Sequence, residues 1–272
     1  MDLGRIGIWR RHMDGVDGLT GLEALGYGAI WVGASPSLAQ ARPFLEASTT
    51  LTVATGILNV WQHAPADVAA QRAELERAFG DRFLLGIGVG HPEATAEWAT
   101  PLQKMTAFFD GLDAGDEPVP REARIAAALG PKMAALAAER SAGVHSYFVP
   151  PAHTRRVRES LGPDALLAPE VTVVVEPDDE TAREIARGFA TNYLARRNYA
   201  NNLRRLGYGE DDIAGGGSDR LIDEVVPHGS AERIAEAIQA HFEAGADHVA
   251  LQPLGHGPAP AADYEALARA IL

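Results

Sequence analysis

The chain has 272 residues, 46% hydrophobic and 22% charged, which is long and apolar enough for a large buried core. Its formal net charge of -13 argues against sequence-independent binding to nucleic acid or to an anionic membrane. The absence of cysteine excludes disulfides, thiolate nucleophiles and zinc-thiolate sites. The first residues lack the apolar core of a signal peptide, and no later run is long enough to span a membrane. We therefore expect a cytoplasmic protein.

Short apolar runs alternate with amphipathic helical patterns along nearly the whole chain. A helix is expected from Pro65, in a first helical turn, to Phe79, with Gly80 ending it. The strands predicted by this alternation are Arg5–Ile8, Ala29–Val32, Leu51–Ile57, Phe83–Val89, Arg124–Ala128, Val144–Phe148, Val171–Val175 and His248–Gln252.

The pattern predicts an α/β fold with a parallel sheet, because the strands are apolar on both faces and are separated by helices. Eight such strands indicate closure into a (β/α)8 TIM barrel, a single domain over residues 1–272 with insertions after strands. The alternative is an open doubly wound sheet. That fold usually carries a dinucleotide fingerprint after its first strand, where this chain has Trp-Arg-Arg-His.

Two segments interrupt the simple alternation. Residues 92–122 have a helical centre at Leu102–Leu112, and residues 190–220 run from a long helix into a polar, glycine-rich stretch. Both are expected to be insertions on the side of the barrel that carries binding loops. The glycine run Gly215–Gly217 is equally well interpreted as a flexible connector.

Catalytic groups of a parallel barrel come from the carboxyl ends of its strands. The glycines at 86, 88 and 90 weaken a strand and indicate close approach of a ligand or of another backbone, although crowding inside the barrel also explains them. The predicted strand ends hold Trp9 and Arg10, Gly33–Ser35, Gly56–Asn59, Gly88–His91, Leu129–Lys132, Tyr147–His153, Glu170 and Gln252–Gly255.

Two of these ends have the residue types of an active site. Gly130, Pro131 and Lys132 open a predicted helix, whose free N–H groups and lysine suit a phosphate, although Lys132 is equally typical of a solvated loop. His91 follows the glycine-rich strand and titrates near neutrality, so it is a candidate acid or base. A structural or surface role is the alternative for His91, and it is favoured for His145 and the other histidines.

Other chemistries find little support. No HExxH motif occurs, the acidic clusters are explained by helix capping or solvation, and no metal site is expected. A serine hydrolase lacks its G-x-S-x-G elbow. A glycosidase needs two carboxylates at strand ends, and only Glu170 is well placed.

Three long stretches carry a resemblance to a known family. They are TGILNVWQHAPADVAAQRAELERAFGDRFLLGIGVGHPE, RIAAALGPKMAALAAERSAGVHSYFVPPAHTRRVRE and NYANNLRRLGYGEDDIAGGGSDRLIDEVV. Together they resemble the bacterial luciferase-like superfamily of flavin-dependent and deazaflavin-dependent oxidoreductases. The last two are most similar to an actinobacterial subgroup thought to use coenzyme F420. The resemblance covers almost the whole chain and implies a TIM barrel.

The resemblance also implies a cofactor, coenzyme F420 or alternatively FMN. In the family, a non-proline cis peptide in the third strand presses on the cofactor ring, and its counterpart here is Gly56-Ile57. The other residues that the resemblance carries over as cofactor contacts are Asn59 at the ring edge, Gly88, Val89 and Gly90 beside the ring, and Gly130, Pro131, Lys132 and Met133 near the phosphate.

One departure from the family concerns the proton donor. Several deazaflavin-dependent members have Asp-His after the second strand, where this chain has Ala34 and Ser35. Ala34 remains a cofactor contact by position. His91, Ser35 or Glu170 would then have to act in place of the missing histidine, or no side chain does.

Three functions follow as hypotheses. The first is an F420-dependent oxidoreductase that transfers hydride between the deazaflavin and a small organic substrate. The second is an FMN-dependent monooxygenase that uses reduced flavin and O2, and the third is a barrel that binds a ligand without turnover. Luciferase-like barrels often dimerise, and the helix over residues 66–79 is a candidate contact for a homodimer. No nucleic-acid or membrane partner is expected.

Overall fold

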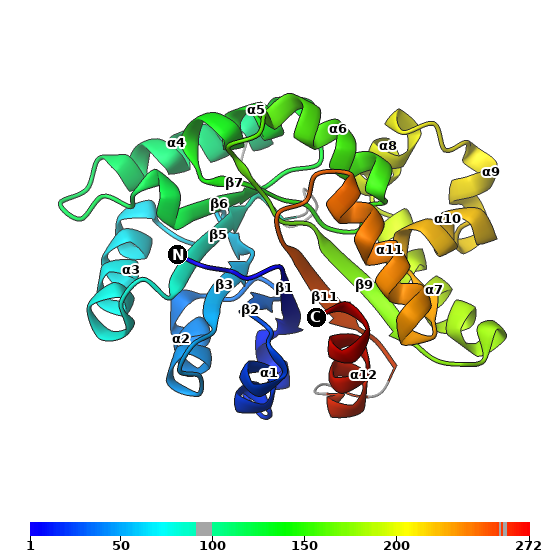
Figure 1. The fold of residues 1–272 in the computed structure, drawn as a ribbon. Coiled ribbons are helices and arrows are strands. Elements are labelled where there is room, and N and C mark those ends of the chain that lie inside the picture. Colours follow the sequence, from blue (N-terminus) through cyan, green and yellow to red (C-terminus); the bar gives the residue numbers. More distant parts are fainter. Residues whose placement is uncertain (91–99, 256, 258–259) are drawn as a thin grey trace.

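Parallel strands and helices alternate throughout the computed structural model, which describes residues 1–90, 100–255, 257 and 260–272 (Figure 1). The strands are β1 (Ile6–Arg11), β2 (Ala29–Gly33), β3 (Thr52–Gly56), β4 (Leu58–Asn59), β5 (Phe83–Gly88), β6 (Arg124–Ala127), β7 (Gly143–His145), β8 (Leu166–Leu167), β9 (Glu170–Val175), β10 (His228–Gly229) and β11 (Val249–Pro253).

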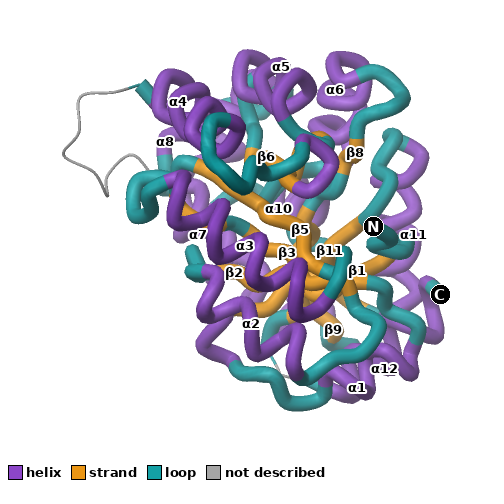
Figure 2. Tube along the Cα trace, turned by 90° about the vertical axis from the view of Figure 1, so that its left-hand side faces the viewer, coloured by secondary structure: helices purple, strands orange, loops and turns teal. Residues whose placement is uncertain are grey.

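Helices follow most of the strands and surround the sheet, as Figure 2 shows from the side. They are α1 (Leu19–Leu25), α2 (Leu38–Glu46), α3 (Pro65–Phe79), α4 (Pro101–Asp113), α5 (Pro131–Arg140), α6 (Pro151–Leu161), α7 (Asp179–Leu194), α8 (Arg197–Arg205), α9 (Glu210–Ile213), α10 (Asp219–Val225), α11 (Ala231–Glu243) and α12 (Ala261–Ile271). Short 3-10 turns lie at His12–Asp14, Arg121–Ala123 and Ala214–Gly216. No described helix is both long enough and apolar enough to cross a membrane.

The sheet closes on itself. Its strands run β10-β9-β11-β1-β2-β3-β5-β6-β7-β8, and every pair is parallel. β8 and β9 are two parts of one extended segment. Within it the Ala168 N–H donates to the Val144 carbonyl on one side, while on the other the Ala250 N–H donates to Pro169, both at 2.9 Å. The predicted barrel is therefore confirmed, and the open doubly wound sheet is excluded.

One tryptophan fills the middle of the barrel. Trp31 is fully buried, stacks on His145 with ring centroids 4.2 Å apart, and donates its indole N–H to His248 at 2.9 Å. The strands around it present small residues, among them Ala54 and Ala250. A second, larger apolar layer lies between the strands and the surrounding helices. The strands are thus buried on both faces, as their continuous apolar sequences predict.

The segment between β9 and β10 is the largest insertion. It contributes α7, α8, α9 and α10, which enclose an apolar cluster of their own, and Figure 1 shows α8, α9 and α10 grouped beside the barrel. The glycine run Gly215–Gly217 forms a turn of left-handed residues. Arg187 of α7 donates to the Gly217 carbonyl. The run is therefore a turn bound to α7 and not a free connector.

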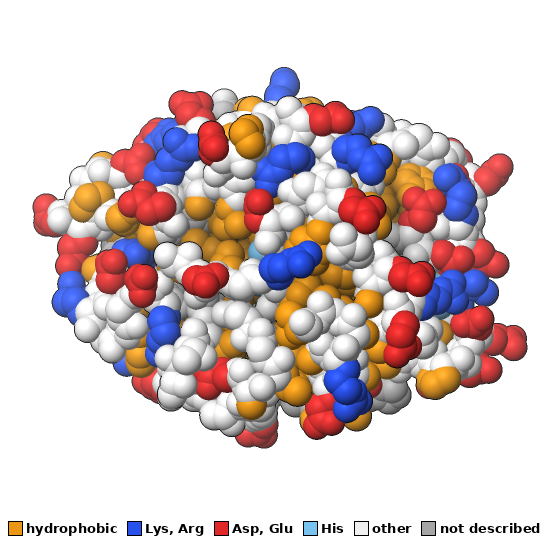
Figure 3. Space-filling view, viewed as in Figure 1, with side chains coloured by type: hydrophobic (Ala, Val, Ile, Leu, Met, Phe, Trp, Pro, Cys, Tyr) orange, Lys and Arg blue, Asp and Glu red, His pale blue; other side chains and the backbone are white. Residues whose placement is uncertain are grey.

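The other insertion agrees with its predicted helical centre. α4 begins after Thr100, whose hydroxyl accepts from the Gln103 N–H while the Gln103 side chain accepts from the Thr100 N–H. This reciprocal pair satisfies two N–H groups at the helix start and fixes where α4 begins. On the face seen in Figure 3, acidic and basic side chains are interspersed around the rim, with apolar side chains in the middle.

A tight crossing between β3 and β5 gives the fold a testable requirement. Thr55 donates its hydroxyl to the Gly86 carbonyl at 2.7 Å and accepts from the Gly86 N–H at 2.8 Å. A Cβ on Gly86 would lie 1.8 Å from the Thr55 carbonyl oxygen. Gly86 is therefore explained by the close approach of the β3 backbone at Thr55.

We expect Gly86→Ala to lower the free energy of unfolding by about 3 kcal/mol or more, because backbone must move to admit the methyl group. The control is Gly188→Ala in the exposed middle of α7, where a Cβ meets nothing within 4 Å. That change should stabilise the protein by about 0.5–1 kcal/mol. Urea unfolding of the two variants measures both effects, and equal stabilities would contradict the expectation.

Candidate active site

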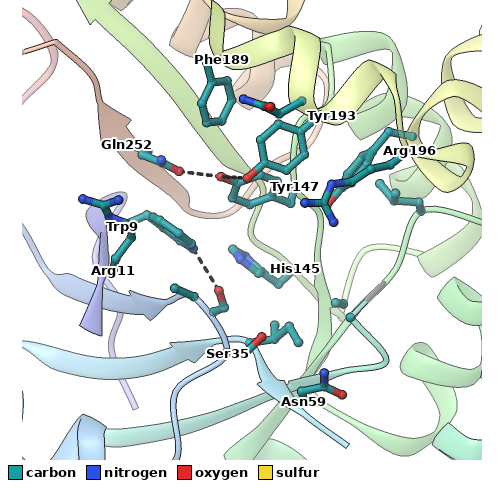
Figure 4. Close-up of a pocket in the computed structure, with 18 of the residues that line it drawn as sticks. Trp9, Arg11, Ser35, Asn59, His145, Tyr147, Phe189, Tyr193, Arg196 and Gln252 are labelled. Carbon is teal, nitrogen blue, oxygen red and sulfur yellow. Dashed lines mark hydrogen bonds between the residues drawn. The ribbon is translucent and has the colours of Figure 1, made fainter. Parts of the chain in front are cut away.

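A cavity of about 1060 Å³ lies at the carboxyl ends of the strands (Figure 4). Its floor comes from residues that follow β1, β2, β3, β5 and β6, and part of its wall comes from α7 and α8. Drug-sized ligands occupy cavities of about 300–1,000 Å³, so this one accepts a large organic molecule. The predicted site residues that line it are Ala34, Ser35, Gly56, Ile57, Asn59, Val89, Gly90, Gly130 and Met133.

The peptide bond between Gly56 and Ile57 is cis, as the sequence resemblance predicts. Trp9 from β1 donates its indole N–H to the Gly56 carbonyl at 3.2 Å. A Cβ on Gly56 would lie 2.8 Å from that indole nitrogen, which is closer than real Cβ contacts come. The residue at position 56 must therefore be glycine if Trp9 is to sit against this strand.

The end of β5 is held against the same region. Gly90 has a φ of 59°, and a Cβ there would lie 2.9 Å from the Asn59 amide nitrogen. Asn59 is only 5% exposed, and its amide oxygen accepts from the Trp61 N–H at 3.1 Å. Glycine at position 90 thus lets the chain pass close to Asn59, and both residues line the cavity.

Four of the described predicted residues do not line the cavity. Gly88 lies behind it, because a Cβ there would meet Ala127 and Ile57 side chains at 2.9 and 3.0 Å, so packing explains this glycine. Pro131 and Lys132 are exposed in the first turn of α5 and lie outside the lining. Glu170 is buried away from the cavity surface. His91 lies outside the described residues.

Glu170 is a fully buried carboxylic acid that is hydrogen-bonded to the loop after β7. Its carboxyl accepts a hydrogen bond from the Thr172 hydroxyl at 2.5 Å and from the Phe148 N–H at 3.3 Å. Burial raises the pKa of Glu170 from 4.5 to about 8, so the carboxyl is protonated at neutral pH. Phe148 has a φ of 56°, an uncommon conformation for a bulky residue. The bond to Glu170 helps to hold that backbone, next to Tyr147.

His145 presents a bare ring nitrogen near the cavity floor. Its Nδ1 lies 2.7 Å from the Ala168 carbonyl, which can only accept, so Nδ1 carries the proton and Nε2 a lone pair. No described residue donates to Nε2. Burial lowers the pKa of His145 to about 4, so the ring is neutral. Stacked on Trp31, His145 is a fixed hydrogen-bond acceptor, although its position inside a strand favours a purely structural interpretation from sequence.

A cluster of hydroxyl and amide groups occupies the opposite side of the cavity from Asn59 and Ser35 (Figure 4). Tyr147 donates its hydroxyl to Gln252 Oε1 at 2.7 Å, and Tyr193 donates to the Tyr147 hydroxyl at 3.1 Å. Tyr147 and Gln252 lie at predicted strand ends. Tyr193 lies in α7, and the strand-end pattern of the sequence does not predict it as a site residue.

The cavity wall formed by α7 and α8 is not predicted by the residues at the strand ends, because it comes from helices. Phe189 and Tyr193 lie four residues apart on α7, with ring centroids 4.8 Å apart, and both line the cavity. Tyr199 and Arg196 complete this side, and the Arg196 guanidinium lies 5.8 Å from the Tyr193 ring centre. The sequence signal for this side is a pair of aromatic residues at helical spacing, of which Tyr193 lies inside the predicted insertion over residues 190–220 and Phe189 just before it. Nothing in the sequence indicates that this face of α7 looks into the barrel mouth.

The described residues contain no group of three or more His, Asp or Glu side chains placed to hold a metal ion. The cavity surface instead combines apolar floor residues, backbone groups of the strand ends, two linked phenols and the charged side chains of Arg11, Asp14 and Arg196, with the buried His145 Nε2 beneath the floor. Such a surface suits a large, flat, mostly apolar ligand with a few hydrogen-bonding edges.

The family model described as luciferase-like monooxygenase matches residues 14–110 and 106–248. No curated protein sequence matches.

Solved structures share the fold at low identity. An F420-dependent secondary alcohol dehydrogenase, in complex with an F420-acetone adduct, is 17% identical with a TM-score of 0.76, over 98% of both chains. A coenzyme F420-dependent tetrahydromethanopterin reductase from Methanopyrus kandleri is 14% identical with a TM-score of 0.75, also over 98% of both. The oxygenating constituent of 3,6-diketocamphane monooxygenase from Pseudomonas putida, in complex with FMN, is 17% identical with a TM-score of 0.66, over 100% of this chain and 99% of that one.

The raised pKa of Glu170 makes stability depend on pH. Between pH 4.5 and about 8 the folded protein keeps the proton that the unfolded chain has lost. The contribution of Glu170 to the free energy of unfolding therefore falls as the pH rises through this window, by up to about 1.4 kcal/mol per pH unit. Glu170→Gln should remove this dependence, because an amide does not titrate.

Urea unfolding at pH 5, 6, 7, 8 and 9 measures the effect as the difference between wild type and Glu170→Gln. The exposed Glu184→Gln in α7 serves as the matched control. A wild-type curve that stays parallel to that of Glu170→Gln across this range would show that the carboxyl does not retain its proton.

Proposed function

The chain belongs to the luciferase-like monooxygenase family, and on that premise we propose that it is a coenzyme F420-dependent oxidoreductase. It transfers hydride between the deazaflavin and a small organic substrate. The observation that carries the proposal is the cavity at the strand ends, with Gly56, Ile57 and Asn59 on its floor and the α7 aromatic residues opposite. Two F420-dependent enzymes share the fold with TM-scores of 0.76 and 0.75, which supports this cofactor.

The residues present fit a tricyclic cofactor. Ile57 and Val89 offer apolar contact for the faces of a flat ring, and the volume of about 1060 Å³ leaves room for a substrate beside it. The lone pair of His145 Nε2 has no described donor, and an N–H at the edge of a flavin or deazaflavin ring is a suitable one. The buried orphan acceptor and the apolar floor therefore match the chemistry of the ring.

The cofactor phosphate is assigned to the start of α5. Gly130 and Met133 line the cavity there, and the first turn of the helix has no side-chain cap. Free N–H groups at a helix N-terminus bind anions. Pro131 and Lys132 are retained in this assignment as neighbours of the phosphate, with Lys132 supplying charge from the exposed side and not direct contact with the ring.

When bound, F420 supplies a ring carbon that accepts and releases hydride. The chain itself binds and orients the ring, through Ile57, Asn59 and the strand ends at Val89 and Gly90. The aromatic residues of α7 and α8 keep water from the reacting atoms.

An FMN-dependent monooxygenase is the second candidate. It is favoured by the FMN complex of the diketocamphane enzyme, whose fold this chain shares over its whole length. The ring contacts proposed above accept either cofactor, because the two ring systems share the pyrimidine edge that His145 and Asn59 would contact. If the protein binds neither cofactor, the cavity would instead favour the third hypothesis, a barrel that binds a ligand without turnover.

Fluorescence titration of the purified protein with F420 and with FMN tests these functions. We expect micromolar binding of F420 and weaker binding of FMN. Binding of FMN alone would replace the first function by the second, and binding of neither would favour the non-catalytic barrel.

Filling the cavity floor should weaken the complex. Ala127 lines the cavity at the end of β6, and Ala127→Leu adds bulk where the ring is expected. We expect a Kd for F420 at least about tenfold higher, equivalent to about 1.4 kcal/mol of lost contact. Ala70→Leu on the exposed face of α3 is the matched control and should leave the Kd unchanged. Equal affinities in all three proteins would place the cofactor elsewhere.

A further inference from the structure

The hydroxyls of Tyr147 and Tyr193 are polar groups set in an apolar aromatic wall. The Tyr193 ring lies 4.8 Å from the Phe189 centroid and 5.2 Å from that of Phe148, and the Tyr147 ring lies 5.5 Å from Trp9. Few polar groups placed in an apolar pocket usually fix the orientation of its ligand. These two hydroxyls therefore mark the place where a polar atom of the substrate is bound.

The direction of the hydrogen bonds makes Tyr147 a competent donor. Its oxygen accepts the Tyr193 proton at 3.1 Å, while its own proton goes to Gln252 at 2.7 Å. A hydroxyl hydrogen rotates without moving the ring, so the Tyr147 proton can turn from Gln252 to a substrate oxygen. The bond from Tyr193 remains in place and stabilises negative charge that forms on the Tyr147 oxygen.

The other described candidates for a proton donor are poorly suited. His145 gives its only N–H to the Ala168 carbonyl. Glu170 does not line the cavity. Ser35 is exposed at the end of β2 and has an aliphatic hydroxyl, a much weaker acid than a phenol. Of these four residues, Tyr147, joined to a second hydroxyl that supports it, is therefore the favoured proton donor.

We infer that Tyr147 is the catalytic residue that protonates the oxygen of a carbonyl substrate, and that Tyr193 is the positioning residue that stabilises the resulting phenolate. The inference rests on the proposed function, because that function supplies the hydride. The aromatic wall indicates a substrate with a flat apolar body, such as an aryl aldehyde or ketone.

The atoms and electrons of this step balance. The C–H bond of the reduced cofactor that supplies the hydride would break as the carbonyl carbon gains a C–H bond, the C=O π bond breaks, and its electron pair goes to oxygen. That oxygen forms an O–H bond with the proton of Tyr147, whose O–H bond breaks. The substrate is reduced by two electrons and the cofactor is oxidised by two. Tyr193 then passes its proton to the Tyr147 phenolate and is reprotonated from solvent, which its partial exposure permits.

The Tyr147 hydroxyl is a neutral phenol in the resting protein. Burial raises the pKa of Tyr147 well above 10, so the phenol keeps its proton at neutral pH. An alkoxide that forms on a reduced carbonyl is a strong base and takes a proton from a neighbouring phenol.

The first experiment needs no cofactor. 4-Nitrophenolate carries an oxyanion on a flat ring and changes its absorption when it binds. We expect Tyr147→Phe to weaken its binding at least about tenfold and Tyr193→Phe to weaken it less, because a hydrogen bond to a charged group is lost. Tyr208→Phe, which removes a buried hydroxyl bonded to Glu224 outside the cavity, should bind as wild type does. Equal affinities for wild type and Tyr147→Phe, or no binding to wild type, would overturn the inference.

The second experiment follows single-turnover oxidation of the reduced cofactor by benzaldehyde, by absorbance and without oxygen. We expect Tyr147→Phe to slow this step by about 100-fold or more, with an unchanged Kd for the cofactor. Tyr193→Phe should slow it by roughly tenfold. Wild type and Tyr193→Phe should react more slowly in D2O, and Tyr147→Phe should lose that isotope effect, which a merely structural role would not produce.

The outcomes separate this inference from the proposed function. A wild type that binds neither F420 nor FMN contradicts the proposed function. A wild type that binds cofactor and does not reduce benzaldehyde overturns the inference alone. A Tyr147→Phe variant that reacts at the wild-type rate, or that keeps the solvent isotope effect, overturns it as well.

Discussion

The hydrogen bonds on both edges of residues 166–175 are the constraint on which the site depends. Because this segment pairs with β7 on one side and with β11 on the other, the sheet closes and all strand ends meet at one rim. Tyr147 after β7 and Gln252 in β11 are 105 positions apart in the chain, and closure brings them to hydrogen-bonding distance. An open sheet would leave them at opposite edges, with no common cavity between them.

Two buried polar side chains inside the barrel are uncharged and are held in place by hydrogen bonds. His145 is locked in one tautomer by a backbone carbonyl, and Glu170 is held by a hydroxyl and a backbone N–H while burial keeps its proton. Neutral groups avoid the large penalty of burying unpaired charge. At neutral pH the result is a set of uncharged groups beneath the cavity floor, next to phenols that retain their protons.

Much of the fold and part of the site follow from local sequence. Apolar runs and glycine ends locate the strands, because these features depend on neighbouring residues. The cis bond between Gly56 and Ile57 is predicted by the family resemblance and not by the local sequence pattern alone. Glu170 shows the limit: it is the first residue of β9 and not its carboxyl end, and it pairs with Ala250 inside the barrel, so its carboxyl does not line the cavity. Tyr193 shows a second limit. The face that α7 turns to the cavity depends on two contacts with residues distant in sequence: Tyr193 packs against Phe148, and Arg187 of α7 donates to the Gly217 carbonyl.

The turn at Gly215–Gly217, tied to α7 by Arg187, gives the cavity wall a framework of its own. The helices between β9 and β10 pack around a separate apolar cluster, while the floor is built by the strands. Mutations in that cluster can therefore reshape the wall without altering the strand ends that form the floor. Wall and floor are thus separable parts of one cavity, and the ligand accepted at the mouth can change while the floor beneath it stays the same.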